Sequence, residues 1–217
     1  DNHLLVVNKP AGQPVQEDSS GDLDLLTEAK AFIGREFNKP GKVFIGLVHR
    51  LDRPVSGVVV FARTSKAAAR LSDQLRRRVV KKEYLALVEG RVTEPRSLTS
   101  FLQKRGVKVR LVKESAPGAK EAILRYEPLA VFGRRSLIKV LPLTGRPHQI
   151  RVQLSHDGFP IVGDFKYGAK LSLDGRNIAL HCHKMTLAHP VLKEERTWST
   201  PPPASWPADV RSGLSSF

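Results

Sequence analysis

An aspartate at the edge of an apolar run is the first residue whose type and place suggest chemistry. Residues 49–62 read HRLDRPVSGVVVFA, so Asp52 lies between Leu51 and Arg53, directly before a stretch that should be buried. A carboxylate near apolar surroundings costs free energy unless it has a cationic partner or a chemical task. Taken alone, Asp52 could equally cap a helix or lie in a solvated loop.

Two further stretches add an aromatic ring and a guanidinium. Residues 81–90, KKEYLALVEG, have the alternation of a strand and contain Tyr84. Residues 143–164, LTGRPHQIRVQLSHDGFPIVGD, include a predicted helix that carries Arg151. A strand tyrosine usually fills a core, and a helical arginine is usually solvated or ion-paired. Each stretch is therefore a weak signal by itself.

The tetrapeptide HCHK at residues 181–184 raises the question of a metal site. Alternation along a strand would send Cys182 to the face opposite His181 and His183. No other closely spaced Cys or His pair completes a tetrahedral ligand set. We therefore expect a structural role and no metal, and the absence of a nucleotide-binding glycine loop leads us to expect no cofactor.

The elements that must position these residues can be read from hydrophobic periodicity. Strands are predicted in the segments 3–10, 56–62 and 79–90, and helices in the segments 23–37 and 64–78. Four more strands with short links between residues 96 and 141 favour hairpins and a largely antiparallel sheet. A helix is predicted over 146–158, with Pro147 in its first turn and Gly158 at its end. The proline-rich tail, residues 199–210, is expected to be extended.

Charge indicates the kind of partner. Lys and Arg total 36 against 21 Asp and Glu in 217 residues, which gives a net charge of +15. Such an excess favours a polyanion, and nucleic acid is the commonest one, although charge can also serve solubility alone. Cys182 is the only cysteine, so no intramolecular disulfide can form, and no apolar run reaches the length of a membrane span.

Taken in order along the chain, these stretches resemble the RluA-type pseudouridine synthases, which isomerise uridine in RNA. The resemblance covers nearly the whole chain. It comprises the opening LLVVNKPAG, the HRLD loop with its Ser-Gly pair, the KKEY strand, the TGRPHQIR helix start, the Gly-Asp pair at 163–164, and ALHCHKMTLAHP at 179–190. One departure is Val55, where the family more often has threonine before the Ser-Gly pair, so a hydroxyl is missing beside the aspartate loop.

The resemblance implies an α/β (α+β) pseudouridine synthase fold. This fold has a mixed, mostly antiparallel central sheet flanked by helices and loops, with the active-site cleft between two lobes. We expect one catalytic domain over residues 1–217, without the small N-terminal S4-like RNA-binding domain that some relatives carry.

The resemblance also implies roles for particular residues. Asp52 would be the catalytic aspartate, and the planar fork of Arg151 would hold its carboxylate. Tyr84 would pack against the target base and assist removal of the C5 proton. Because a stacked uridine is out of reach, the nucleotide must be extruded. Arg50 would then hold the flipped strand or fill the vacated space, and His49 would support the loop.

Further residues are expected to contact RNA. Lys9 would bind a backbone phosphate, with a plain solvated lysine as the equal alternative. Arg146 and His148 would shape the site from the N-terminus of their helix. Sequence-independent phosphate contacts are expected from the basic residues Arg76, Arg77, Arg78, Lys81, Lys82, Lys104, Arg105, Lys108 and Arg110.

Two other functions were weighed against an isomerase. An RNA-binding protein that had lost the chemistry should lack at least one of Asp52, Tyr84 and Arg151, and all three are present. A metal-dependent nuclease would need clustered carboxylates, and no other acidic residue stands near Asp52 in the sequence. We therefore expect a ribosomal or transfer RNA substrate, and a cytoplasmic monomer without membrane attachment or obligate protein partner. An organellar matrix is the alternative location if a targeting segment was removed.

Overall fold

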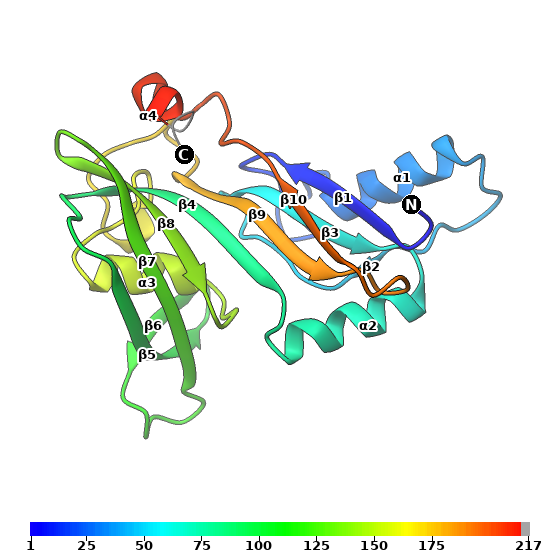
Figure 1. The fold of residues 1–217 in the computed structure, drawn as a ribbon, viewed down its shortest axis with the longest axis horizontal. Coiled ribbons are helices and arrows are strands. Elements are labelled where there is room, and N and C mark those ends of the chain that lie inside the picture. Colours follow the sequence, from blue (N-terminus) through cyan, green and yellow to red (C-terminus); the bar gives the residue numbers. More distant parts are fainter. Residues whose placement is uncertain (214–217) are drawn as a thin grey trace. The chain divides into compact units, whose positions relative to one another are not determined.

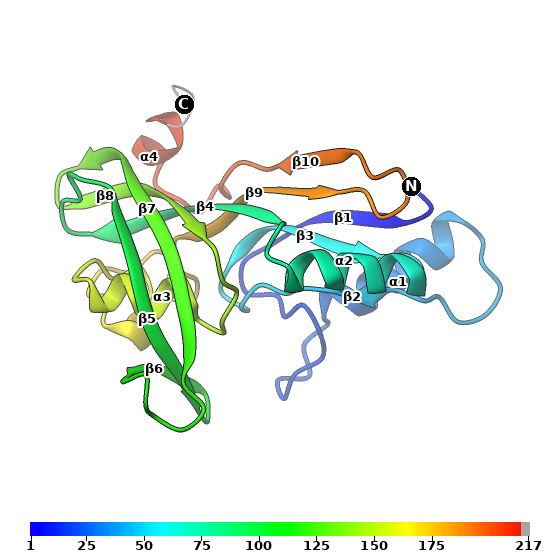
Figure 2. The same ribbon diagram turned by 60° about the horizontal axis from the view of Figure 1, so that its bottom comes forward.

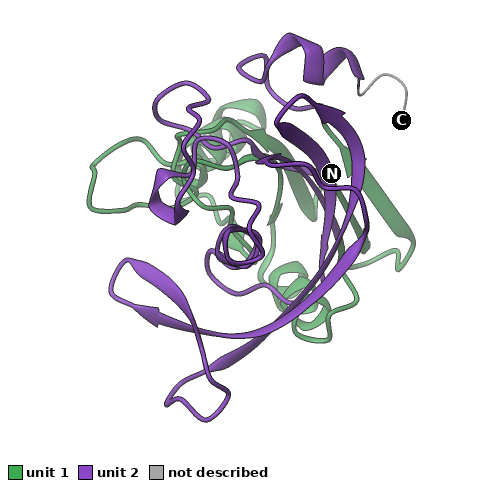
Figure 3. Ribbon diagram, turned by 90° about the vertical axis from the view of Figure 1, so that its left-hand side faces the viewer, with its two compact units in different colours: residues 1–81, 184–200 green, residues 82–183, 201–217 purple. Residues whose placement is uncertain are grey.

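The computed structural model describes residues 1–213, and these residues form two compact units. Unit 1 comprises residues 1–81 and 184–200, and unit 2 comprises residues 82–183 with the segment that begins at Pro201 (Figure 3). The chain therefore passes from unit 1 to unit 2 after residue 81, returns to unit 1 at residue 184 and enters unit 2 again at Pro201. Each unit is described by itself below.

Unit 1 is built on strands that pair antiparallel. Both β1 (Leu4–Lys9) and β2 (Gly46–Leu47) pair with β3 (Ser56–Ala62), and β10 (Glu195–Ser199) pairs with β9 (Leu180–Ala188), whose second half belongs to this unit (Figure 1). Every residue of β3 is buried. The apolar run that follows Asp52 is therefore a strand of the unit's core, as predicted.

Two helices lie on the same side of the unit 1 strands (Figure 2). Helix α1 (Leu25–Glu36) begins after Asp24, whose carboxylate accepts from the backbone N–H of Thr27 at 3.0 Å. Helix α2 (Ser65–Arg76) begins after Thr64, whose hydroxyl accepts from a backbone N–H in the same way. Such N-caps satisfy donors that the first helical turn leaves unpaired. Both helices confirm the periodicity seen in the sequence.

Unit 2 contains a strongly curved antiparallel sheet. Its strands run in the order β4-β8-β7-β5-β6. Their bounds are β4 (Lys81–Glu89), β5 (Arg96–Arg105), β6 (Lys108–Val112), β7 (Lys120–Phe132) and β8 (Arg135–Pro142). The sheet curves around helix α3 (Gln149–His156) (Figure 3). Val152 of the helix packs with Leu102, Val109 and Ala122 of the strands. The hairpins predicted between residues 96 and 141 are confirmed.

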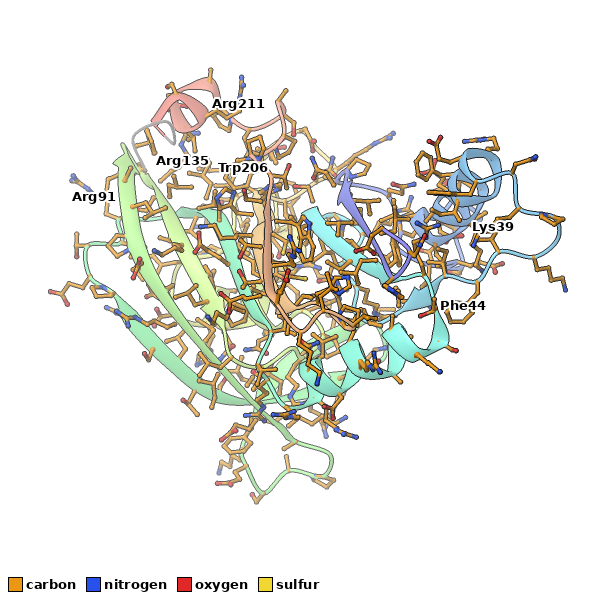
Figure 4. The ribbon with its side chains drawn as sticks, turned by 45° about the vertical axis from the view of Figure 1, so that its right-hand side comes forward. Lys39, Phe44, Arg91, Arg135, Trp206 and Arg211 are labelled. Carbon is orange, nitrogen blue, oxygen red and sulfur yellow. The ribbon has the colours of Figure 1, made fainter. Side chains whose placement is uncertain are left out.

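Two predicted elements were wrong in part. Helix α3 starts at Gln149 and not at Arg146, because His148 has φ 51°, a left-handed conformation that cannot continue a helix backwards. The tail is not extended throughout. Trp206 is buried, and α4 (Ala208–Gly213) follows it, with the Arg211 Nε donating to the Trp206 carbonyl at 3.1 Å (Figure 4). The helix therefore begins only after the proline-rich stretch and the buried Trp206.

The structure confirms the predicted fold class, a mixed α/β chain in which strands pair mostly antiparallel. The expectation of one catalytic domain stays a prediction. Among residues 1–213, no helix is both long enough and apolar enough to cross a membrane.

Candidate active site

Asp52 lies in a tight loop of unit 1 between β2 and β3. Its backbone carbonyl accepts from the N–H of Val55 at 3.0 Å, which closes a turn. Leu51 and Val55 are buried on either side of the half-buried aspartate. Val55 therefore anchors the loop through its apolar side chain at the position where the family more often has threonine.

Lys9, at the end of β1, lies beside this loop with a fully buried side chain. Its Nζ donates to three backbone carbonyls, those of Gln13 at 2.7 Å, Pro10 at 2.9 Å and Arg53 at 3.1 Å. Burial lowers the pKa of Lys9 to about 7, and the nearby charge of Asp52 opposes this shift. These surroundings differ from the exposed phosphate contact that we expected. Lys9 ties the aspartate loop to the segment that follows β1.

Arg53 makes a second connection to the same segment. Its Nε donates to the Gly12 carbonyl at 2.9 Å, and its guanidinium forms ion pairs with Asp18 and Asp22. The Gly12 N–H in turn donates to the Arg53 carbonyl at 2.8 Å. Gly12 has φ 87°, a conformation that glycine adopts without strain. No role for Arg53 was predicted from the sequence, because its partners precede it by 31 residues or more.

His49 and Arg50 precede the aspartate and differ in surroundings. The His49 Nε2 accepts from the backbone N–H of Val60 at 2.9 Å, so this ring connects the loop to β3. That contact is what a supporting residue needs. Arg50 is exposed, which leaves its side chain accessible to a ligand. The RNA contacts expected of both residues stay predictions.

Tyr84 lies on β4 in unit 2, paired across the ladder with Val140. Its side chain is 8% exposed, and its hydroxyl forms a hydrogen bond with Cys182. Burial raises the pKa of the Cys182 thiol to about 12, so this cysteine is neutral at pH 7. The Tyr84 hydroxyl therefore contacts a neutral sulfur, and the packing of the ring against a base stays a prediction.

Arg151, on α3, is fixed by a carboxylate that sequence reasoning had left without a role. Its Nε and Nη2 donate to the two oxygens of Asp164 at 2.7 and 2.9 Å. Both side chains are buried, at 7% and 1% exposure. The guanidinium carbon also lies 5.1 Å from the centroid of the Tyr167 ring. This two-pronged pair sets the plane and direction of the guanidinium.

The segment around Asp164 is shaped by glycines and by Tyr167. Gly163 has φ 87°, and a Cβ there would clash with the backbone carbonyl oxygen of Asn177, so only glycine fits. Tyr167 ends the short helix η1 (Phe165–Tyr167), and its hydroxyl contacts the His148 Nδ1 at 2.6 Å. The Gly-Asp pair was visible in the sequence, but the pairing partner of Asp164, 13 residues away, was not.

Arg151 and Asp52 belong to different units, so their expected pairing stays a prediction. The same holds for the grouping of Asp52, Tyr84 and Arg151 into one site.

Arg146 and His148 lie in the segment before α3. The Arg146 Nε donates to the Glu121 carbonyl at 2.8 Å, and its backbone N–H donates to the Gln149 side chain at 3.0 Å. His148 contacts Tyr167 as described. Both residues are thus held by unit 2 neighbours ahead of the helix, and their expected part in shaping the site stays a prediction.

The basic residues from the end of α2 onward divide into exposed ones and a half-buried one. Exposed cations are Arg76, Arg77, Arg78 and Lys81. Arg76 and Arg77 pair with Asp73, and Lys81 pairs with Glu195. Lys82 instead has a half-buried side chain on β4. The basic residues Lys104, Arg105, Lys108 and Arg110 are exposed on the β5–β6 hairpin.

Metal ligation was tested against the described part of the chain. Within it, no group of three or more His, Cys, Asp or Glu side chains is arranged to hold a metal ion. His181 and His183 have ring centroids 6.4 Å apart, and His181 also meets Trp206 edge to face. The histidines of HCHK therefore pack with aromatic neighbours.

Comparison with known proteins identifies the family. A family model described as RNA pseudouridylate synthase matches residues 3–156. The chain belongs to the RNA pseudouridylate synthase family. The matched region contains the loop of Asp52, the strand of Tyr84 and the helix of Arg151. The resemblance to RluA-type pseudouridine synthases is thereby confirmed.

Individual relatives agree with this family assignment. The chain is 36% identical over 213 residues to a ribosomal large subunit pseudouridine synthase C of Haemophilus ducreyi, covering 93% of this chain and 63% of that protein. It is 34% identical to an uncharacterized RNA pseudouridine synthase of Bacillus subtilis, covering 98% of this chain and 68% of the relative. It also resembles the solved human RNA pseudouridylate synthase domain containing 4, with 25% identity, TM-score 0.79, and coverage of 99% and 90%.

The chain spans less than two thirds of the length of some of these relatives. Coverage is 62% for a pseudouridine synthase C of Buchnera aphidicola and 63% for the Haemophilus protein. Family membership follows from the match over residues 3–156.

Proposed function

We propose that this protein isomerises uridine to pseudouridine in RNA. The observation that carries the proposal is the Asp52 loop, which Lys9 and Arg53 fix to the segment after β1 in a chain of the pseudouridylate synthase family. The reaction breaks the bond between N1 of uracil and C1′ of ribose. The uracil then turns, C5 bonds to C1′, and the C5 proton leaves while N1 gains one. The product is an isomer, so no oxidant and no group donor is needed.

Asp52 would act as the nucleophile or base and must be ionised for either role. The cation that offsets its desolvation would be Arg151, which the Asp164 carboxylate orients. Arg151 fits this task because a guanidinium stays protonated and can hold two carboxylates through different edges of its fork. Asp164 would thus be a positioning residue that acts through Arg151.

Tyr84 would hold the extruded base by packing its ring against the uracil. Its hydroxyl, bonded to Cys182, would help to remove the proton from C5 once the base has turned. The neutral thiol makes a weak hydrogen-bonding partner, which leaves the hydroxyl able to exchange it for a ligand. Arg50, exposed beside Asp52, would contact the flipped strand.

The substrate would be structured RNA. The net charge of +15 supports a polyanionic partner. Relatives named ribosomal large subunit pseudouridine synthase favour ribosomal RNA over transfer RNA. We further propose a single catalytic domain that works as a cytoplasmic monomer without cofactor or metal.

The test is pseudouridine mapping of total RNA from cells with and without the gene. We expect at least one uridine in ribosomal RNA to lose its modification when the gene is deleted. Re-expression of the wild-type gene should restore it. Identical maps with and without the gene would contradict the proposed function, and a loss confined to transfer RNA would correct the substrate.

A further inference from the structure

Lys82 is a cation for which the described part of the chain provides no counter-charge. Its side chain is half-buried on β4, and no hydrogen bond or ion pair of its amine is found within residues 1–213. The group that raises its pKa is Cys182, whose thiol is neutral at pH 7. Burial lowers the pKa of Lys82 and outweighs this effect. A buried ammonium without a partner costs free energy, so its presence here calls for an explanation.

The position of Lys82 relative to Tyr84 suggests that explanation. Residues two apart on a strand point to the same face, with their Cα atoms about 7 Å apart. That separation is comparable to the distance between the base and the phosphate of one nucleotide.

The loop that precedes α3 also lies close to the Lys82 amine. The Lys82 Nζ lies 3.5 Å from the point that a Cβ would occupy at Gly145. Arg146, the next residue, uses its Nε to bind the Glu121 carbonyl, and within residues 1–213 its terminal guanidinium nitrogens have no recorded acceptor. Two cations thus flank an exposed glycine, where backbone can come close to a ligand.

We propose that Lys82, with Gly145 and Arg146, binds one phosphate of the substrate RNA, adjacent to the nucleotide whose base packs on Tyr84. This rests on the proposed function, because it assigns a phosphate subsite to the same reaction. In this proposal Lys82 contacts one particular phosphate, whereas the exposed cations contact RNA phosphates at no particular position. A compact ammonium suits a phosphate oxygen as a point charge. The phosphate would supply the counter-charge that the protein does not.

The test uses a synthetic RNA fragment containing the uridine located by mapping. One version is unmodified, and two others carry a neutral methylphosphonate at the linkage 5′ or 3′ of that uridine. Single-turnover conversion is measured with wild-type protein, with Lys82→Gln and with the matched control Lys81→Gln, whose exposed amine pairs with Glu195. Thermal unfolding of each variant checks that it is folded.

We expect one neutral linkage to slow wild type and Lys81→Gln about tenfold at subsaturating RNA, and to have no effect on Lys82→Gln. Neutralising either partner should remove the same contact. An equal loss in Lys82→Gln, or no loss in any protein, would overturn the subsite. The subsite would also be overturned if Lys82→Gln converted saturating RNA slowly and this loss did not depend on which linkage is neutral. That result would indicate that the Lys82 amine contacts the uracil base and not a phosphate. If wild type converts no mapped uridine, the proposed function fails and the subsite with it.

Discussion

Two lysines of this chain, one fully buried and one half-buried, are surrounded in opposite ways. Lys9, in unit 1, gives its amine to three backbone carbonyls and lies beside the Asp52 loop. Lys82, in unit 2, has no acceptor within residues 1–213 and lies beside Tyr84 and Gly145. Both amines lose hydration, and burial lowers both pKa values. Only Lys9 is compensated by the protein itself.

The difference separates a structural cation from one that is ready for a ligand. A buried polar group that is satisfied internally stabilises the fold, whereas an unsatisfied one costs stability unless something else binds it. Arg151 is a third buried cation, and its Nε and Nη2 donate to Asp164, which sets the direction of the guanidinium. The following predictions use these three cations to test that distinction, beginning with the largest effect.

Asp164→Asn should have the largest effect on stability. The variant removes the buried carboxylate to which the Nε and Nη2 of Arg151 donate, so the free energy of unfolding should fall by about 3 kcal/mol. Because the guanidinium loses its fixed direction, conversion of RNA should also slow by at least about tenfold. Denaturant unfolding and single-turnover assays measure the two effects. Wild-type values for both would show that Asp164 does not position Arg151.

Lys9→Met should destabilise the protein by about 2 kcal/mol at pH 8. With a folded pKa of about 7 the amine is mostly neutral at pH 8 and carries two hydrogens, so two of its three carbonyl partners lose a donor, while the side chain keeps a similar length and an apolar stem. The matched control is Lys30→Met on the exposed face of α1, which should change the free energy of unfolding by less than about 0.5 kcal/mol. Equal effects of the two substitutions on the free energy of unfolding would show that the hydrogen bonds of Lys9 do not stabilise the fold.

The stability contributed by Lys9 should depend on pH. Its pKa is about 7 when folded and 10.5 when unfolded, so between these values the unfolded chain binds more protons. The free energy of unfolding should therefore rise with pH in this window, by up to about 1.4 kcal/mol per unit. Comparison with Lys9→Met between pH 7 and 9.5 isolates this group. A constant difference between the two proteins would contradict the lowered pKa.

Lys82→Met should have the smallest effect on stability. The amine has no acceptor to lose within the described residues, so the free energy of unfolding should stay within about 0.5 kcal/mol of wild type or rise. RNA affinity should nevertheless fall, with a salt slope shallower by about one unit. A loss of stability as large as that of Lys9→Met would show that Lys82 is structural too.

Much of the fold could be predicted from the sequence, because alternation and helical spacing are local signals. The apolar run of β3 and the hairpins of unit 2 were recognised in this way. The start of α3 was not, since the left-handed His148 is held by a contact with Tyr167, 19 residues away. Helix α4 was not predicted, because the prolines before it indicated an extended tail and the sequence alone does not show that Trp206 is buried.

The candidate residues could be named from motifs, but their surroundings could not. Lys9 and Lys82 look alike in the sequence, each next to charged or turn residues. Their difference depends on which carbonyls the folded chain brings to each amine. The pairing of Arg151 with Asp164 likewise needs the turn at Gly163, whose shape only the folded backbone reveals.

The roles proposed for Lys9 and Lys82 both depend on the isomerisation of uridine by Asp52. The most direct measurement is tritium release from a mapped RNA fragment labelled at C5 of uridine, because this hydrogen leaves when C5 bonds to ribose. Under single-turnover conditions, wild type should release the label without any added cofactor. Asp52→Asn, which keeps the shape of the side chain and loses its charge, should bind the fragment but release label at least about a thousandfold more slowly. Release by Asp52→Asn within about tenfold of wild type would contradict the account.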